Sequence, residues 1–133
     1  MIKKVNHMAI AVTNLDEALD LYNRLFGLRP EKVETVTEQR VKAAILPVGE
    51  GSEIELIQPI DSDSGVAKFL EKRGEGVHHV ALEVDDIDQE LKSLAAKGVE
   101  LIDKEPRSGV AGRVAFLHPK STRGILIELV QKV

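Results

Sequence analysis

Two stretches of the chain repeat one another. The segment VNHMAIAVTNLDEAL begins at Val5, and VHHVALEVDDIDQEL begins at Val77, 72 residues later. The match includes a histidine, which is His7 in the first copy and His79 in the second. The later segments IELIQ and IELVQ also match, at an offset of 73 residues. A duplicated unit predicts two similar modules, so the structure of one copy constrains the whole fold.

Each copy has the pattern of a βαβββ unit. It opens with an aliphatic strand-like run, continues with TNLD or DDID, which suit a helix start, and then shows apolar residues at helical spacing. Three strand-like segments follow each helix: 31–37, 40–48 and 52–58 in the first copy, and 99–104, 112–118 and 124–131 in the second. We therefore expect an α+β fold in which two paired βαβββ modules form a curved mixed sheet.

The repeat also sets the expected domain organisation. Residues 1–133 are predicted to form a single domain, with the first module at 1–60 and the second at 77–133. Between them, residues 61–76 read as a linker with a short helix, because Val66, Phe69 and Leu70 lie at helical spacing before two glycines.

Composition limits the function classes. The chain is 43% hydrophobic and 30% charged with a net charge of -4, which is typical of a soluble globular protein and argues against a broad nucleic-acid surface. It has no cysteine, so a metal would have to be bound by nitrogen and oxygen. Because no span-length apolar run and no signal-peptide pattern are present, we expect no membrane partner and a cytoplasmic location.

The two histidines fall on the less bulky face of their strands. Side chains of a strand point alternately to its two faces. His7 thus shares a face with Ala9 and Ala11, and His79 shares one with Ala81. The larger aliphatic residues take the opposite face, which is expected to pack under the helix. A face with small residues and one imidazole suits the lining of a ligand site.

Two glutamates interrupt the apolar last strand of each copy at equivalent places. These are Glu55 and Glu128, and burying either carboxylate without a partner would be costly. Pairing of the modules is expected to bring them together with His7 and His79 around a metal site. Two imidazoles and two carboxylates suit divalent Co, Ni, Mn, Fe or Zn, and an octahedral arrangement would leave two open positions. The alternative is that the histidines are ordinary hydrogen-bonded residues and the glutamates are solvated, but retention at matched positions favours ligation.

The chain resembles the vicinal oxygen chelate superfamily over nearly its whole length. Within it, the segments GEGVHH, from Gly74, and HPKSTRGILIEL, from His118, are most similar to the methylmalonyl-CoA epimerase family. The resemblance implies metal-dependent interconversion of (2R)- and (2S)-methylmalonyl-CoA, by abstraction of the C2 proton through a metal-stabilised enolate. It also implies a divalent metal, with cobalt preferred, and the ligands His7, Glu55, His79 and Glu128.

Inversion at C2 requires acid/base groups on both faces of the substrate. We expect Glu128 to serve one face. Some bacterial epimerases carry a glutamate, proposed as an acid/base, at the position that aligns with Ala43 in this chain. Glu38, in TEQRV, is the substitute candidate here, and its alternative role is that of a solvated residue in a hairpin turn.

The coenzyme A part of the substrate requires local cations. Lys120, Arg123, Arg113 and Arg107 are candidates, although for any single one of them a solvated surface is the favoured interpretation. His118 precedes a proline and lies either in a turn or at the rim of the site.

The expected partner is a small-molecule CoA thioester, and the resemblance adds a homodimer. Two other functions stay open at this point. One is glyoxalase I-type lactoylglutathione lyase activity, and the other is a metal-free small-molecule-binding module of the same fold.

Overall fold

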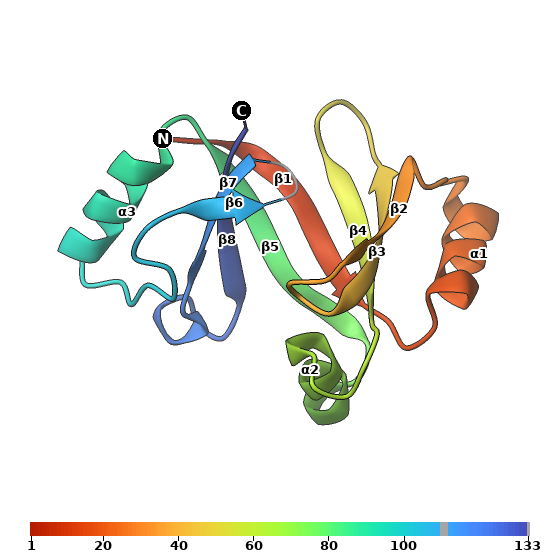
Figure 1. The fold of residues 1–133 in the computed structure, drawn as a ribbon. Coiled ribbons are helices and arrows are strands. Elements are labelled where there is room, and N and C mark those ends of the chain that lie inside the picture. The colour runs from red at the N-terminus through yellow and green to blue at the C-terminus, as the bar shows by residue number, and fades with distance from the viewer. Residues whose placement is uncertain (110–111, 133) are drawn as a thin grey trace. The chain divides into compact units, whose positions relative to one another are not determined.

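A computed structural model of the chain describes residues 1–109 and 112–132. The chain divides into two compact units. The first unit is His7–His78, and the second combines Met1–Asn6 with His79–Val133. The order βαβββ occurs twice along the chain, and each unit contains a mixed sheet with helices, so the predicted α+β class is confirmed (Figure 1).

The first unit contains a mixed sheet whose strand order is β2-β3-β4-β1. Strands β1 and β4 are parallel, whereas the β2–β3 and β3–β4 pairs are antiparallel. Two helices belong to this unit, and α1 lies beside the sheet in Figure 1. The elements are β1 (Ile2–Ala11, of which His7 onward belongs here), α1 (Leu15–Phe26), β2 (Lys32–Val36), β3 (Val41–Pro47), β4 (Glu53–Pro59) and α2 (Gly65–Arg73).

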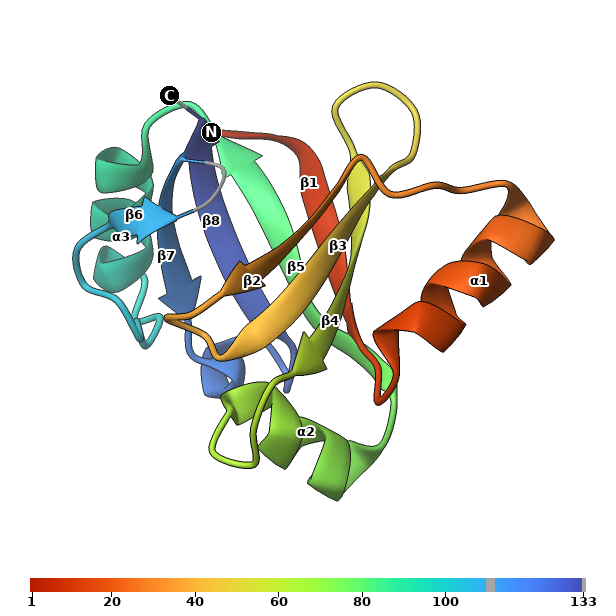
Figure 2. The same cartoon turned by 45° about the vertical axis from the view of Figure 1, so that its right-hand side comes forward.

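The second unit repeats this arrangement with the order β5-β8-β7-β6. Strands β5 and β8 are parallel, and the β7–β8 and β6–β7 pairs are antiparallel. Helix α3 runs beside this sheet, as Figure 2 shows. The elements are β5 (Gly76–Val84, from His79 onward in this unit), α3 (Ile87–Ala96), β6 (Arg107–Gly109), β7 (Gly112–Leu117), a short 3-10 helix (Pro119–Ser121) and β8 (Leu126–Lys132).

The predicted helix starts are confirmed. The side chain of Asn14 accepts a hydrogen bond from the backbone N–H of Glu17 at α1, and Asp86 accepts one from Gln89 at α3. These caps satisfy N–H groups that the first helical turn leaves without a partner. Helix α1 ends at Gly27, whose φ of 70° is the left-handed conformation that glycine adopts without strain.

No helix in the described part of the chain is long and apolar enough to cross a membrane.

The helix-facing side of each sheet is built from the bulky residues, as the alternation predicts. In the first unit, Val12 and Leu56 form a core cluster with Leu15 of α1. In the second unit, Val84 and Leu129 do the same with α3. At roughly 25 cal/mol per Å² of buried apolar surface, burial of both clusters stabilises the fold.

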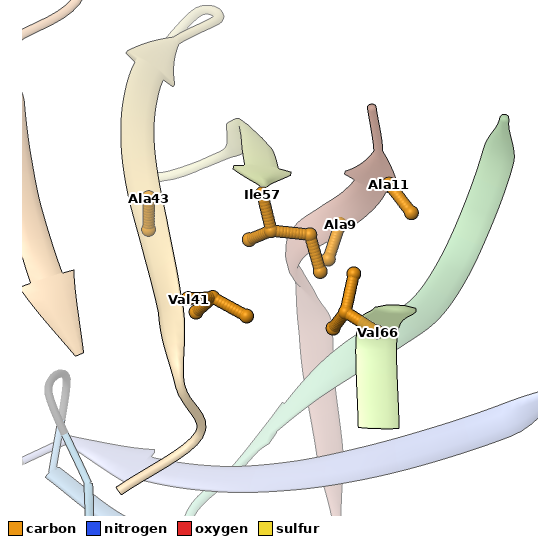
Figure 3. Packing of buried hydrophobic residues seen from close by; sticks show 6 residues of the cluster. All are labelled: Ala9, Ala11, Val41, Ala43, Ile57 and Val66. Carbon is orange, nitrogen blue, oxygen red and sulfur yellow. The ribbon is translucent and has the colours of Figure 1, made fainter. Parts of the chain in front are cut away.

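The small-residue face of the first unit is more covered than the sequence suggests. Ala9 and Ala11 are fully buried, and they pack with Ile57 and with Val66 of α2 (Figure 3). Their side chains therefore belong to a second hydrophobic core under α2. The interpretation of this face as the lining of a site is wrong for these two alanines, because a sequence repeat does not reveal that the segment between the copies folds back onto the first one.

A glutamine in each copy ties the last strand to the start of the helix. Gln58 accepts a hydrogen bond from the backbone N–H of Leu15 at 2.6 Å, and Gln131 accepts one from Ile87 at 2.8 Å. Both N–H groups lie in the first turn of a helix and have no partner within it. The glutamine that ends both IELIQ and IELVQ is thus explained by a structural role.

Replacing Gln58 or Gln131 with alanine should destabilise the protein by about 1 kcal/mol each, because one N–H of a helical first turn loses its acceptor. Urea unfolding followed by circular dichroism measures this directly. Gln89→Ala is a suitable control, since Gln89 contributes its backbone N–H and not its side chain to the cap of α3. Equal stability of all three variants would contradict the assigned role.

The predicted strand at 99–104 is wrong. Leu101 forms an isolated bridge with Leu117, and the strand that pairs with β7 is β6, at Arg107–Gly109. The carboxylate of Asp103 accepts the backbone N–H of Phe116 at 2.8 Å. In a regular β-sheet a backbone carbonyl would accept this N–H. Here a side-chain carboxylate accepts it instead, so regular strand pairing ends at this point.

Candidate metal and substrate site

The second unit places a histidine and a glutamate together on the sheet face opposite to α3. His79 lies on β5 and Glu128 on β8, and both side chains are buried. Nε2 of His79 lies 3.1 Å from Oε1 of Glu128. The ring of Phe116 on β7 stands edge-on to the His79 imidazole, with centroids 5.6 Å apart. The carboxylate thus sits in a largely apolar environment with an imidazole as a close partner.

The first unit holds the equivalent pair. His7 lies on β1 and is buried, and Glu55 lies on β4 and is partly exposed. Nε2 of His7 lies 3.8 Å from Oε2 of Glu55. The sequence predicted that pairing of the modules would bring all four residues together, which stays a prediction. Within each unit, the structure places the histidine near the glutamate of the same copy.

The His79–Glu128 pair fits the requirements of metal ligands. Ligands at right angles on one metal, each about 2.1 Å from it, lie about 3 Å apart, which the His79–Glu128 separation of 3.1 Å matches. Among the described residues, the buried side chains suited to holding a metal ion are His7, His79 and Glu128. Imidazole nitrogen and carboxylate oxygen are the donors that Zn, Mn, Fe, Co and Ni accept. The donor chemistry therefore favours a divalent metal.

Glu38 lies away from these residues in its own unit. It is exposed in the turn at 37–40 between β2 and β3, where Arg40 has a φ of 56°. The backbone N–H groups of Gln39 and Arg40 close this turn by donating to the carbonyls of Val36 and Thr37. This location agrees with the alternative of a solvated turn residue, and the acid/base role of Glu38 stays a prediction.

Two of the candidate arginines lie on different sides of the second sheet. Arg113 donates to both carboxylate oxygens of Asp88 in α3, at 2.8 and 3.1 Å, so it has a structural partner on the helix side. This hydrogen bond lowers the pKa of Asp88. Arg107 lies with its guanidinium over the ring of Phe116, 5.5 Å from the centroid, on the same face as Glu128. Arg107 also has a carboxylate partner, since its Nε donates to Asp103 Oδ1 at 3.2 Å, but of the two it is the arginine on the face of Glu128.

The remaining substrate candidates lie around the short 3-10 helix. His118 Nδ1 accepts the backbone N–H of Lys120 at 3.0 Å and so caps this helix, and it lies 3.4 Å from Glu100. Lys120 is exposed within the helix, and Arg123 is exposed in the turn before β8 with a φ of 61°. His118 thus has the turn role, whereas substrate contacts of all three stay predictions.

A hollow of about 830 Å³ lies on the helix side of the second unit. Its walls include Leu91 of α3 and Leu101, which belong to the core cluster under that helix, and also His118. His79 and Glu128 are not among its lining residues. The hollow is therefore separate from the histidine and glutamate pairs.

The repeated modules and their histidine–glutamate pairs define a protein of the glyoxalase type. A family model described as Glyoxalase/Bleomycin resistance protein/Dioxygenase superfamily matches residues 6–116. The mitochondrial methylmalonyl-CoA epimerase of Dictyostelium discoideum is 42% identical over 98% of this chain and 80% of its own length. The chain is an enzyme of the methylmalonyl-CoA epimerase family within this superfamily.

Solved structures of the same family match equally well. A variant of Streptomyces coelicolor methylmalonyl-CoA epimerase in complex with 2-nitronate-propionyl-CoA is 37% identical, with a TM-score of 0.93 over 100% of this chain and 96% of that one. A methylmalonyl-CoA epimerase in complex with methylmalonyl-CoA and NH4+ has the same identity, TM-score and coverage. The resemblance expected from the sequence is confirmed at the level of family and fold.

Proposed function

We propose that the chain interconverts (2R)- and (2S)-methylmalonyl-CoA in a metal-dependent reaction that removes the C2 proton and returns it on the other face. The main support for this proposal is that each repeat contains one histidine–glutamate pair, at equivalent positions and on equivalent faces. Membership of the epimerase family, with relatives solved in complex with CoA thioesters, supports this substrate class.

The proposed metal ligands are His7, Glu55, His79 and Glu128. A bound divalent metal would supply positive charge to the thioester oxygen, on which negative charge develops as the proton leaves C2. Burial of the His79–Glu128 pair keeps bulk water away from the carboxylate, which strengthens its electrostatic interactions. Cobalt is the preferred metal in this proposal.

Glu128 is proposed to exchange a proton with C2 on one face of the substrate. Its carboxylate accepts the proton, and the electron pair of the C–H bond moves into the thioester carbonyl. Glu128 is 6% exposed, so bulk water has little access to its carboxylate. Inversion then requires a second group that protonates the opposite face.

The CoA phosphates are proposed to meet Lys120 and Arg123. Both are exposed, and both belong to the segment that leads directly into β8, the strand of Glu128.

A homodimer and a cytoplasmic location stay predictions from the sequence.

The test is to strip the protein of metal, reload it with Co²⁺ and incubate it with a single isomer of methylmalonyl-CoA in D₂O. We expect deuterium to appear at C2 together with the opposite isomer, and both to depend on metal. Chiral separation with mass spectrometry follows the two signals. Metal-loaded protein that gives neither signal is not this epimerase. In that case, turnover of the glutathione hemithioacetal of methylglyoxal would identify a lactoylglutathione lyase, and a failure to bind metal would favour a metal-free binding module.

A further inference from the structure

Edge strand β6 carries an arginine on the same face of the second sheet as Glu128. Arg107 pairs with Val114 on β7, and Val114 pairs with Val130 on β8. Paired residues point to the same face of a sheet, and so do residues two apart along a strand. Val130 lies two residues after Glu128, so Arg107 belongs to the face of the histidine–glutamate pair of this unit.

The guanidinium of Arg107 lies one aromatic ring away from this pair. Its Cζ is 5.5 Å from the centroid of the Phe116 ring. The same ring stands nearly perpendicular to the imidazole of His79, with 5.6 Å between the centroids. Phe116 is also the residue of β7 that pairs with Glu128 on β8. Phe116 therefore has the arginine as one neighbour and the histidine of the pair as another.

A carboxylate holds the guanidinium in this place and leaves most of its donors available. Nε of Arg107 donates to Oδ1 of Asp103 at 3.2 Å, while Oδ2 of Asp103 accepts the backbone N–H of Phe116. Among the described residues, the polar contact of this guanidinium is the one through Nε, so the two Nη groups can bind a ligand. The donors form a rigid planar fork, so a fixed Nε also fixes the direction of the Nη groups. The side chain is 44% exposed, which gives a ligand access.

Arg107 is the cation nearest to the pair on this face of the sheet. The basic side chains of strands β5 to β8 are Arg107, Arg113 and Lys132. Arg113 lies on the opposite face, where it binds helix α3. Lys132 shares the face of Glu128 but lies four residues further along β8, where its charge helps to lower the pKa of Glu83. An anionic group bound beside the pair would therefore meet Arg107.

The group of the proposed substrate that fits this arginine is the free carboxylate of the acyl unit. In methylmalonyl-CoA this carboxylate is bonded directly to C2, whereas the CoA phosphates lie beyond the long pantetheine arm. When C2 lies at Glu128, as proposed above, the acyl carboxylate is the anion closest to the reacting carbon. The fork of a guanidinium matches the two oxygens of a carboxylate, and such charge-assisted hydrogen bonds are among the strongest in proteins.

We propose that Arg107 binds the free carboxylate of the acyl unit through its Nη groups, and that this contact selects malonyl-type thioesters over acyl thioesters without that carboxylate. This proposal rests on the proposed epimerase function. Removal of the C2 proton places negative charge on the thioester oxygen, close to the carboxylate. The guanidinium offsets the repulsion between these two negative groups. Asp103 is a positioning residue, because it holds the guanidinium over Phe116.

The test compares Arg107→Gln with Arg73→Gln. Arg73 is a matched control because it also lies over a phenylalanine ring, 5.7 Å from the centroid of Phe69, but on helix α2 of the first unit. Calorimetry measures the affinity of each metal-loaded variant for methylmalonyl-CoA and for propionyl-CoA, which carries hydrogen in place of the carboxylate. We expect Arg107→Gln to weaken methylmalonyl-CoA binding by about 10- to 100-fold and to leave propionyl-CoA binding within about twofold, as for a lost charge-assisted contact. Arg73→Gln should bind both thioesters as the wild type does.

A second variant separates the charge of Arg107 from the shape of its fork. Arg107→Lys keeps a positive charge near Phe116 but presents a single ammonium group, so it should recover part of the lost affinity for methylmalonyl-CoA. The ratio of the two affinities is measured within one sample, so a partly unfolded fraction does not alter it.

The outcomes distinguish this assignment from the proposed function. Equal weakening of both thioesters in Arg107→Gln would place Arg107 on the CoA part of the ligand and overturn the proposal. Unchanged affinity for both thioesters would overturn it as well. A wild-type chain that prefers methylmalonyl-CoA and loses this preference in Arg107→Gln, yet does not invert C2, would support the carboxylate contact and overturn the proposed reaction.

Discussion

Replacement of Glu128 with glutamine is expected to lower epimerisation by about 10²- to 10⁴-fold, the range typical of lost acid/base catalysis. The substitution keeps the shape of the side chain and one oxygen donor, but it removes the negative charge and the capacity to hold a transferable proton. The carboxylate that is lost is buried and lies 3.1 Å from His79. Steady-state conversion of single-isomer methylmalonyl-CoA, together with metal content by mass spectrometry, measures the effect.

Glu55→Gln is the matched control, because Glu55 is the equivalent residue of the other repeat. Its side chain is 20% exposed and its Oε2 lies 3.8 Å from Nε2 of His7, so an amide oxygen can replace the carboxylate with little change in burial or in donor type. We expect this variant to keep its metal and to invert within about tenfold of wild type, since it loses one ligand charge and no proton-transfer group. Near-normal turnover of Glu128→Gln would remove Glu128 from the proton-transfer step. An equal, severe loss in both variants would mean that the two glutamates act only as metal ligands.

The repeat made the fold and the two histidine–glutamate pairs predictable because it marked equivalent positions without any structural information. The same argument could have explained Gln58 and Gln131, which the copies also share and which bind the helix starts. It failed for residues outside the repeat. Val66 is an example, because the segment between the copies gives no indication that it will bury Ala9 and Ala11.

Glu38 shows a different limit of sequence reasoning. The sequence offers it as a candidate acid/base group, and the structure places it in the exposed turn between β2 and β3. Likewise the partner of Arg113 is Asp88, 25 residues away on α3, and no local pattern predicts that contact.

The buried pair of Asn6 and Glu83 is expected to contribute to the acid sensitivity of the second unit. Oε1 of Glu83 accepts a hydrogen bond from Nδ2 of Asn6 at 3.1 Å, and both residues are almost inaccessible. Burial alone would raise the pKa of Glu83, but the Asn6 hydrogen bond and the nearby charges of Lys4, Lys132 and Lys3 outweigh it and leave the pKa below 4.5. Because the pKa is lowered by folding, the ionised carboxylate contributes its full stability above about pH 4.5, and this contribution is lost as the pH falls through the folded-state pKa.

Asn6→Ala should therefore destabilise the protein by about 1 to 3 kcal/mol at pH 7, the usual cost of leaving a buried group without its hydrogen bond. The difference from wild type should shrink on acidification, because a protonated Glu83 no longer depends on this donor for a buried charge. Urea unfolding at pH 7 and at progressively lower pH measures both effects. Asn23→Ala is the control, since the Asn23 side chain is exposed and makes a long hydrogen bond of 3.3 Å to Leu28. A difference between Asn6→Ala and wild type that stays constant with pH would mean that Asn6 contributes through packing and not through the charge of Glu83.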